Sequence, residues 1–197
     1  MLRRLFCLLI TCAGPVLAQV SVPDNPTLEV AVTQITSDGH TLYQVDASAT
    51  VHTPLAAAWK ILTDYERMSE FVPELASAKI LSRAGNQIVI EQFGAARFLF
   101  IAKPIHLIVR ATETPMSAID IALISGNMQH YEARWELRPA LSGPNPAGSV
   151  RIIYRGRLMP DFYVPGLFGV SMVRHDIRRM MQAVLARLAG GREQTDN

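Results

Sequence analysis

The sequence predicts an α+β protein in which a bent antiparallel sheet is covered by one long C-terminal helix. Alternating apolar and polar residues, the pattern of half-buried strands, fill residues 28–51 and 74–159. Helical spacing is confined to residues 53–72 and to a final segment at 166–188. Segregated runs of strands and helices favour α+β over a parallel α/β sheet. A sheet with one apolar face must bury that face, and the last helix is the element able to cover it.

Residues 1–18 are expected to form a signal peptide. The basic start MLRR is followed by the apolar run LFCLLITCA and by Val16-Leu17-Ala18, a small-residue cleavage site. The apolar run is too short to span a bilayer as a helix. We therefore expect the mature chain to begin at Gln19 and to reach the periplasm. A buried N-terminal helix is one alternative, and a lipoprotein anchored through Cys12 is another.

Removal of this segment would change the cysteine count and the charge. Cys7 and Cys12 both lie within it, so the mature chain would have no disulfide and would depend on its core for stability. Without Arg3 and Arg4 the 19 basic residues become 17, which equals the 17 acidic ones. This balance gives no reason to expect a nucleic-acid partner, and we expect a monomer.

The mature chain opens with a lead-in and a first strand within residues 19–39. Asp38-Gly39 is a strong turn signal between two β-rich runs, so a hairpin is predicted to join the first strand to a second strand that begins at residue 40.

A pair of short helices is predicted after this hairpin. Thr53 is a suitable N-cap, and Pro54 fits the first helical position. Thr63 and Glu66 have the spacing of a capping box, which predicts that a second short helix starts there. Pro73 is expected to end it.

The strands from residue 74 to 159 are predicted to have one apolar and one charged face. At Pro104 the apolar phase slips by one residue, which predicts a bulge in a bent strand. Asp120 is expected to point outward. Three arginines share one face of the last strand and are expected to pair with Glu132 and Glu136: Arg151, Arg155 and Arg157.

The C-terminal helix carries one apolar stripe at 3.6-residue spacing, made of Val170, Val173, Ile177, Met180, Met181, Val184 and Leu188. Phe168 and Met172 fall nearly opposite the stripe. They would form a contact patch for a membrane or a partner if exposed, or would fold under if the helix starts later. Residues 190–197 are expected to form a polar tail.

The segment VHTPLAAAWKILTDYERMSEFVPELASAKIL resembles the start of cyclase/dehydrase-like proteins of the START-related SRPBCC superfamily. That group includes polyketide cyclases and coenzyme Q-binding START-domain proteins. The later stretches RWELRP and GRLMPDFYVPGLFG resemble the family's late strands and the entry into its closing helix. The resemblance covers residues 40–189.

The resemblance implies a helix-grip fold, in which a strongly bent sheet wraps around the C-terminal helix and leaves a cavity between them. It also implies a hydrophobic small-molecule ligand, such as a lipid, an isoprenoid or a polyketide. The helix pair would lie at the mouth of that cavity.

The candidate ligand-binding residues are the inward aromatic and apolar ones: Tyr65, Phe71, Phe98, Phe100, Trp135, Tyr154, Val173, Ile177, Met180 and Met181. Each of them has core packing as its alternative role. The five histidines show no metal-ligand spacing, no nucleophile elbow or phosphate loop occurs, and no cofactor is expected. A binding protein is the leading hypothesis. A cyclase or dehydratase remains the enzyme alternative and needs an acid or base inside the cavity. A cavity-less interaction module is the third hypothesis.

Overall fold

The computed structural model describes residues 27–37, 40–98, 101–141, 148–162, 164 and 166–190. The expected signal peptide and most of the polar tail lie outside these ranges. Eight strands and three helical segments follow one another along the chain: β1 (Glu29–Ser37), β2 (His40–His52), α1 (Leu55–Leu62), the 3₁₀ helix η1 (Tyr65–Glu70), β3 (Leu75–Ala84), β4 (Gln87–Phe98), β5 (Ile101–Thr114), β6 (Ala118–Gly126), β7 (Met128–Pro139), β8 (Ser149–Pro160) and α2 (Gly166–Gly190).

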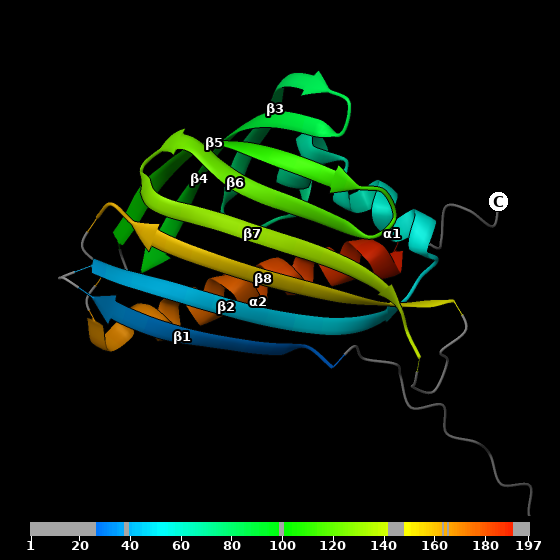
Figure 1. Cartoon of the computed structure of the whole chain (residues 1–197). Coiled ribbons are helices and arrows are strands. Elements are labelled where there is room, and N and C mark those ends of the chain that lie inside the picture. The colour runs from blue at the N-terminus through cyan, green and yellow to red at the C-terminus, as the bar shows by residue number, and fades with distance from the viewer. Residues whose placement is uncertain are drawn as a thin grey trace, which may run out of the picture.

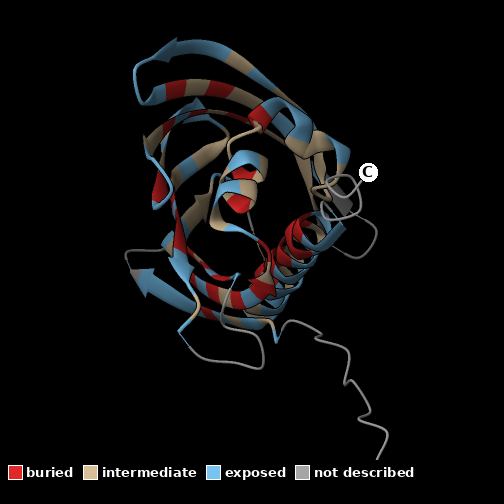
Figure 2. Cartoon of the chain, turned by 90° about the vertical axis from the view of Figure 1, so that its right-hand side faces the viewer, coloured by how far each residue is buried: buried red, intermediate tan, exposed pale blue. Residues whose placement is uncertain are grey.

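The strands form one antiparallel sheet in the order β1-β2-β8-β7-β6-β5-β4-β3. The sheet curls around the helices (Figures 1 and 2), and α2 packs on β1, β2, β4 and α1. The N-terminal hairpin joins the sheet through β8, where Tyr43 pairs with Leu158 and His52 with Ser149. The predicted fold class, a bent sheet gripping a C-terminal helix, is confirmed.

The inner face of the sheet follows the predicted alternation. On β2 the odd positions are buried from Tyr43 to Val51, while Asp46 and Thr50 face solvent. On β7 the inward set includes Ala133, Trp135 and Leu137. A period of two places successive side chains on opposite faces, so one apolar face accumulates from every strand.

The start of α1 differs from the prediction by one residue. Pro54, in extended conformation, takes the N-cap position, and no side-chain hydrogen bond caps the helix. Thr53 is buried instead, so its side chain serves packing at the end of β2.

The predicted capping box before η1 is wrong. The Thr63 hydroxyl donates to the carbonyl oxygen of Trp59 at 2.9 Å and so belongs to the end of α1. Glu66 reaches forward to β3, where its Oε1 accepts from the backbone N–H of Ile80 at 3.2 Å. The helix does break and restart here as predicted, but side chains of both residues bond elsewhere.

The predicted bulge at Pro104 is also wrong. Pro104 pairs in register with Ala95 of β4, and the irregularity of β5 lies between Ile108 and Val109, toward β6. Pro104 lies where β5 extends beyond β6, and its carbonyl accepts from the side chain of Asn127 at 2.7 Å. Proline is tolerated there because no neighbouring strand requires its missing N–H.

The entry into β3 crosses closely over β4. Glu74 adopts a positive φ of 66°, and its carbonyl oxygen accepts from the backbone N–H of Ala95 at 2.9 Å. A Cβ on Gly94 would lie 2.3 Å from that oxygen. The Glu74 carboxylate also pairs with Arg179 of α2 at 2.7 Å, so this crossing ties η1, the sheet and α2 together.

Helix α2 buries the predicted stripe and adds Leu185 to it. Val170 and Met180 are only partly buried. Phe168 is 50% exposed and Met172 is partly buried, so Phe168 stands out from the helix surface. Among the described residues no helix combines the length and apolar character needed to cross a bilayer.

Candidate functional site

The two ends of the inner face differ in their access to water. Near α1 the inward strand residues Ile119, Leu137 and Ile152 are buried, as are Leu62 of α1 and Leu188 of α2. Trp59, Met68 and Phe71 of the helix pair are partly buried. At the opposite end the inward apolar residues are only partly buried: Ile105, Leu123, Tyr131, Leu158 and Val170. We call this set the accessible end.

The accessible end lies away from α1, whereas the helix pair was expected at the mouth of the cavity. Helix α1 packs on β7, β8 and α2, next to the start of β8. Leu158 and Tyr131, which pair with each other, belong to the other end of these two strands. Because the chain leaves β2 next to the start of β8, α1 packs at the end of the inner face opposite the accessible end. The expectation that the helix pair lies at the mouth of a cavity stays a prediction.

Two predicted ligand contacts, Tyr65 and Phe71, interact with other side chains of the protein. The Tyr65 hydroxyl donates to Oε1 of Glu113 on β5 at 2.9 Å. Burial and this hydrogen bond raise the pKa of Tyr65 well above its ordinary value. The guanidinium of Arg187 lies 5.8 Å from the ring centre of Phe71. Both contacts fasten η1 to its neighbours.

The other predicted residues lie in the interior or outside the described side chains. Trp135 and Tyr154 are buried, with ring centres 4.8 Å apart at an interplanar angle of 60°. On α2 the predicted residues Val173, Ile177 and Met181 are buried, whereas Met180 is partly exposed. Phe98 ends β4, but its side chain and the whole of Phe100 lie outside the described residues.

A pair of tyrosines marks the boundary between the buried core and the accessible end. Burial raises the pKa of both Tyr131 and Tyr154, and the two hydroxyls lie near enough to influence each other's pKa. The Tyr154 ring lies along its strand over Gly156, with the hydroxyl 3.1 Å from where a Gly156 Cβ would be. Tyr131 was not among the predicted contacts, although its alternation with Ala133 and Trp135 indicated that it faces inward.

Tyr43 lies in the same row of the sheet, since Leu158 pairs with both Tyr43 and Tyr131. Its side chain is fully buried against the start of α2, where a Cβ on Gly169 would overlap the hydroxyl. Within the described part of the chain this hydroxyl has no hydrogen-bond partner.

We expect Tyr43→Phe to raise the free energy of unfolding by about 1 kcal/mol, because it removes a buried hydroxyl that has lost its water without gaining a partner. Tyr65→Phe, the matched control, removes a buried hydroxyl that donates to Glu113 and should lower stability by about 1 kcal/mol. Urea unfolding of both variants measures the difference. A loss of stability in Tyr43→Phe would show that its hydroxyl is paired.

Asp176 is a partly buried acid on α2 that the sequence analysis overlooked. It stands four residues from Met172 and from Met180, so the three side chains share one ridge at the edge of the buried stripe. Burial raises the pKa of Asp176 to about 6; the positive charges of His175 and Arg179 oppose this shift, and Glu74 adds to it. An acid between two methionines on such a ridge is the pattern that could have revealed it.

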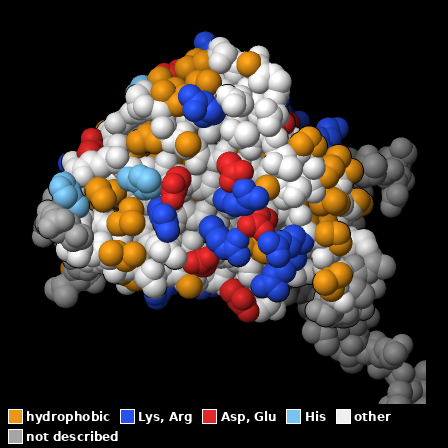
Figure 3. Space-filling model, viewed as in Figure 1, with side chains coloured by type: hydrophobic (Ala, Val, Ile, Leu, Met, Phe, Trp, Pro, Cys, Tyr) orange, Lys and Arg blue, Asp and Glu red, His pale blue; other side chains and the backbone are white. Residues whose placement is uncertain are grey.

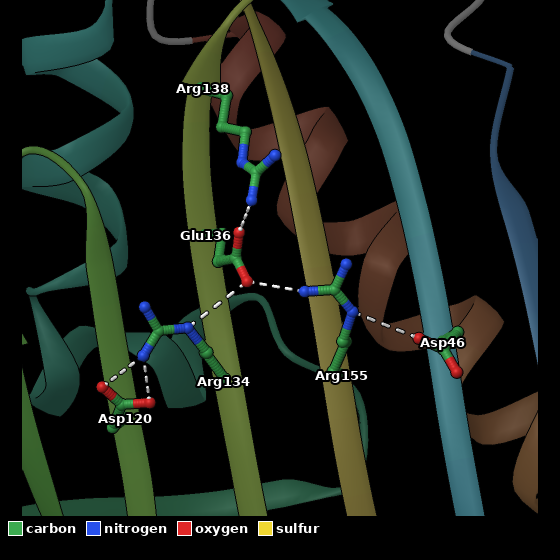
Figure 4. Close-up of polar contacts among 6 residues, drawn as sticks. All are labelled: Asp46, Asp120, Arg134, Glu136, Arg138 and Arg155. Atoms are coloured by element: carbon green, nitrogen blue, oxygen red, sulfur yellow. Dashed lines mark hydrogen bonds and ion pairs between the residues drawn. The ribbon is translucent and has the colours of Figure 1, made fainter.

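The outer face of the sheet carries the charged residues (Figure 3). Glu136 is 8% exposed and accepts from Arg138 at 2.5 Å, Arg155 at 2.6 Å and Arg134 at 3.3 Å (Figure 4). Asp120 forms an ion pair with Arg134, and Asp46 forms one with Arg155.

The predicted pairing of the arginine stripe is confirmed for two of its three members. Arg155 pairs with Glu136, and Arg157 pairs with Glu132 at 3.3 Å. Arg151 instead donates to the hydroxyl of Ser48. Two hollows of about 540 and 330 Å³ lie among these side chains, and their charged walls do not suit an apolar ligand.

Among the described residues no three His, Cys, Asp or Glu side chains are grouped so that they could hold a metal ion.

The sequence matches the model of a protein family described as polyketide cyclase / dehydrase and lipid transport, over residues 51–185. The chain belongs to this family. The match begins at the end of β2 and ends within α2, so it includes β3 to β8 and most of the covering helix but not β1. No curated protein matches the sequence.

Solved structures of low sequence identity share the fold of this family member. A START superfamily protein from Mycobacterium smegmatis is 17% identical, with a TM-score of 0.62 over 75% of this chain and 97% of that one. The Zhui aromatase/cyclase from Streptomyces sp. R1128 is 15% identical, with a TM-score of 0.60 over 79% and 96%. A STAR-related lipid transfer protein from Xanthomonas axonopodis is 12% identical, with a TM-score of 0.57 over 80% and 98%.

Proposed function

We propose that this polyketide cyclase / dehydrase and lipid transport family member is an exported carrier of an apolar small molecule, such as a lipid, an isoprenoid or a polyketide-like compound. The ligand would lie between α2 and the inner face of the sheet, at the accessible end. The observation that carries the proposal is the incomplete burial of inward strand residues at this end, whereas Ile119, Leu137 and Ile152 at the other end are buried. Covering such residues with an apolar ligand is favourable because it removes their surface from water.

The family's description, which includes lipid transport, supports a hydrophobic ligand. Export is inferred from the three-part pattern of residues 1–18. Phe168, half exposed at the start of α2, would then lie beside the entrance and would be available to touch a membrane or a partner that delivers the ligand.

The test is to express the full chain with its N-terminal segment, purify it from the periplasm and extract it with organic solvent. We expect the intact mass to show a chain that begins at Gln19. Mass spectrometry of the extract should show an apolar species in stoichiometric amount. A chain of full mass retained in the cytoplasm would refute export.

Two tryptophan substitutions on neighbouring residues of β6 locate the site. Leu123 faces inward at the accessible end, whereas Ile124 faces outward and is 45% exposed. Leu123→Trp should abolish the co-purified species by filling its space, and Ile124→Trp should retain it. Met180→Trp is a second blocking variant in case Leu123→Trp does not fold. Equal retention in folded blocking variants would refute a ligand at this end.

Asp176 favours one competing function, an enzyme of the cyclase or dehydratase type. A carboxyl group with a pKa of about 6 can give or take a proton near neutral pH, and a general acid or base needs this property. Incubating the stripped protein with the extracted compound distinguishes the two functions. A carrier releases the compound unchanged, whereas an enzyme converts it, and Asp176→Asn should abolish that conversion.

A further inference from the structure

The two borders of the sheet, β3 and β1, are built differently. A border strand has backbone N–H and C=O groups with no neighbouring strand, and these groups can pair with another chain. Strand β3 is protected against such pairing. The helix η1 packs on it, its register is interrupted twice, and the carboxylate of Glu66 accepts the backbone N–H of Ile80 at 3.2 Å. Lys79 and Arg83 add exposed charges along the same strand.

Strand β1, the lower border of the sheet in Figure 1, is regular and almost uncharged. Its nine residues, EVAVTQITS, include no proline, glycine, lysine or arginine, and its pairing with β2 runs without a register shift. In the part of the chain that the structure describes, no segment other than β2 is hydrogen-bonded to β1. Valine, isoleucine and threonine favour a strand, so the free side of β1 is well formed for a further strand.

The sequence of β1 suits a second copy of itself in antiparallel order. Pairing all nine residues places Thr33, the central one, opposite Thr33 of the second copy. The only charged residue of β1, Glu29, then lies opposite Ser37 of the second copy, so the two negative charges stand at opposite ends of the paired strands. Parallel addition in register would instead place the two carboxylates side by side, which is unfavourable.

The same alignment covers an exposed apolar side chain. Because Val32 is buried against the core, alternation places Ala31, Thr33 and Ile35 on the outer face. Ile35 is 50% exposed, and the alignment puts the small, exposed Ala31 of the second copy opposite it. This contact occurs on both sides of the central threonine pair. Cross-strand pairs of threonine and of apolar residues both stabilise a sheet.

We propose that β1 is the contact surface for a second copy of this chain, which adds its own β1 in antiparallel order and continues the sheet across a twofold axis at Thr33. This inference does not depend on the proposed function, and it replaces the expectation of a monomer. One pair of strands buries less surface than a standard interface, so the dimer should be weak and should form with rising concentration. The antiparallel order points the two accessible ends in opposite directions and leaves both open.

Sedimentation velocity over a wide range of concentrations tests the dimer, on protein purified after expression of the full chain. Thr33→Lys would place two positive charges opposite each other at the axis, and Thr33 is exposed, so the monomer should fold normally. It should raise the dissociation constant of the dimer by about fivefold or more. Thr114→Lys is the matched control, because Thr114 is exposed at the end of β5, away from β1.

Cysteine substitutions test the register independently. Thr33→Cys should form a disulfide between two copies under mild oxidation, because the axis brings the two substituted positions opposite each other. Ala31→Cys, on the same face, should not, because its two copies lie four residues apart along the paired strands. Any background from Cys7 or Cys12 is common to both variants.

Each outcome bears on the proposal. A concentration-dependent dimer that Thr33→Lys weakens and Thr114→Lys does not, with cross-linking confined to Thr33→Cys, supports it. A wild-type protein that stays monomeric at every concentration refutes it; slow hydrogen exchange along β1 in that monomer would indicate that the chain's own residues 19–26 cover the strand. A dimer that both lysine variants affect equally, or that Ala31→Cys cross-links as readily, refutes this surface.

Discussion

Replacing Glu136 with glutamine is expected to lower the free energy of unfolding at pH 7 by about 2–3 kcal/mol. The register of β7 and β8 places Arg134 directly opposite Arg155, which would repel each other without an intervening anion. Glu136 supplies that anion and also holds Arg138. Breaking a buried ion pair from one side costs up to about 3–5 kcal/mol, and the half-exposed arginines reduce this figure because water still solvates them.

The loss should depend on pH in a defined direction. Burial alone would raise the pKa of Glu136, but the hydrogen bond from Arg138 and the charges of Arg138, Arg155 and Arg134 outweigh it and hold the pKa below its ordinary value. A carboxylate whose pKa is lowered by folding stabilises the protein fully above its unfolded pKa, about 4.3, and loses this contribution as the pH falls through the folded pKa. The difference between wild type and Glu136→Gln should therefore shrink in acid.

Urea unfolding of both proteins from pH 7 to pH 3 measures this dependence. Glu132→Gln is the matched control on the same strand face, because the Glu132 side chain is about half exposed and its arginine contact is long. It should cost no more than about 0.5 kcal/mol. A deficit in Glu136→Gln that persists undiminished at pH 3 would contradict the electrostatic explanation.

Gly94→Ala is expected to cost about 2–3 kcal/mol, although Gly94 does not have a positive φ. The added methyl group would lie 2.3 Å from the backbone carbonyl oxygen of Glu74, which cannot rotate away as a side chain would. The entry into β3 would have to lift from β4, which strains or breaks the Ala95–Glu74 hydrogen bond and the Glu74–Arg179 ion pair.

Gly85→Ala separates steric from conformational cost. Gly85 has a φ of +59° and no atom within 4 Å of its added Cβ, so its replacement should cost only about 1 kcal/mol. Thermal unfolding of both variants measures the two costs. Equal losses would mean that β3 moves aside easily and that the crossing over Gly94 is not tight.

The fold was predictable because its main signals are periodic. Alternation identified the inner face of the strands, and 3.6-residue spacing identified the buried stripe of α2, with Leu185 as the omission. The caps were mispredicted because hydroxyl and carboxylate groups bond wherever tertiary structure brings a partner. Glu66, for example, bonds to the backbone of Ile80 rather than to its own helix.

The candidate site was less predictable because it depends on the register between distant strands. Sequence spacing indicates that Tyr131 and Tyr154 face inward, but their closeness to each other follows from the pairing of β7 with β8 and from the space over Gly156. The raised pKa of Asp176 depends on its burial and on Glu74, which lies in a different part of the chain. Which end of the inner face stays accessible depends on where α1 packs, and periodicity carries no such information.

The insertion of the N-terminal hairpin beside the last strand has a consequence for the order of folding. The meander from β3 to β8 pairs neighbours along the chain, whereas 97 residues separate His52 from its partner Ser149. Contacts between distant segments form late, because the loop between them must first lose its conformational entropy. Export would require the chain to emerge from a membrane N-terminus first. The strand β2 would then leave the membrane before its partner β8 and would remain unpaired until β8 follows. During this interval its unpaired edge can join a strand of another chain, so aggregation competes with folding mainly at this step.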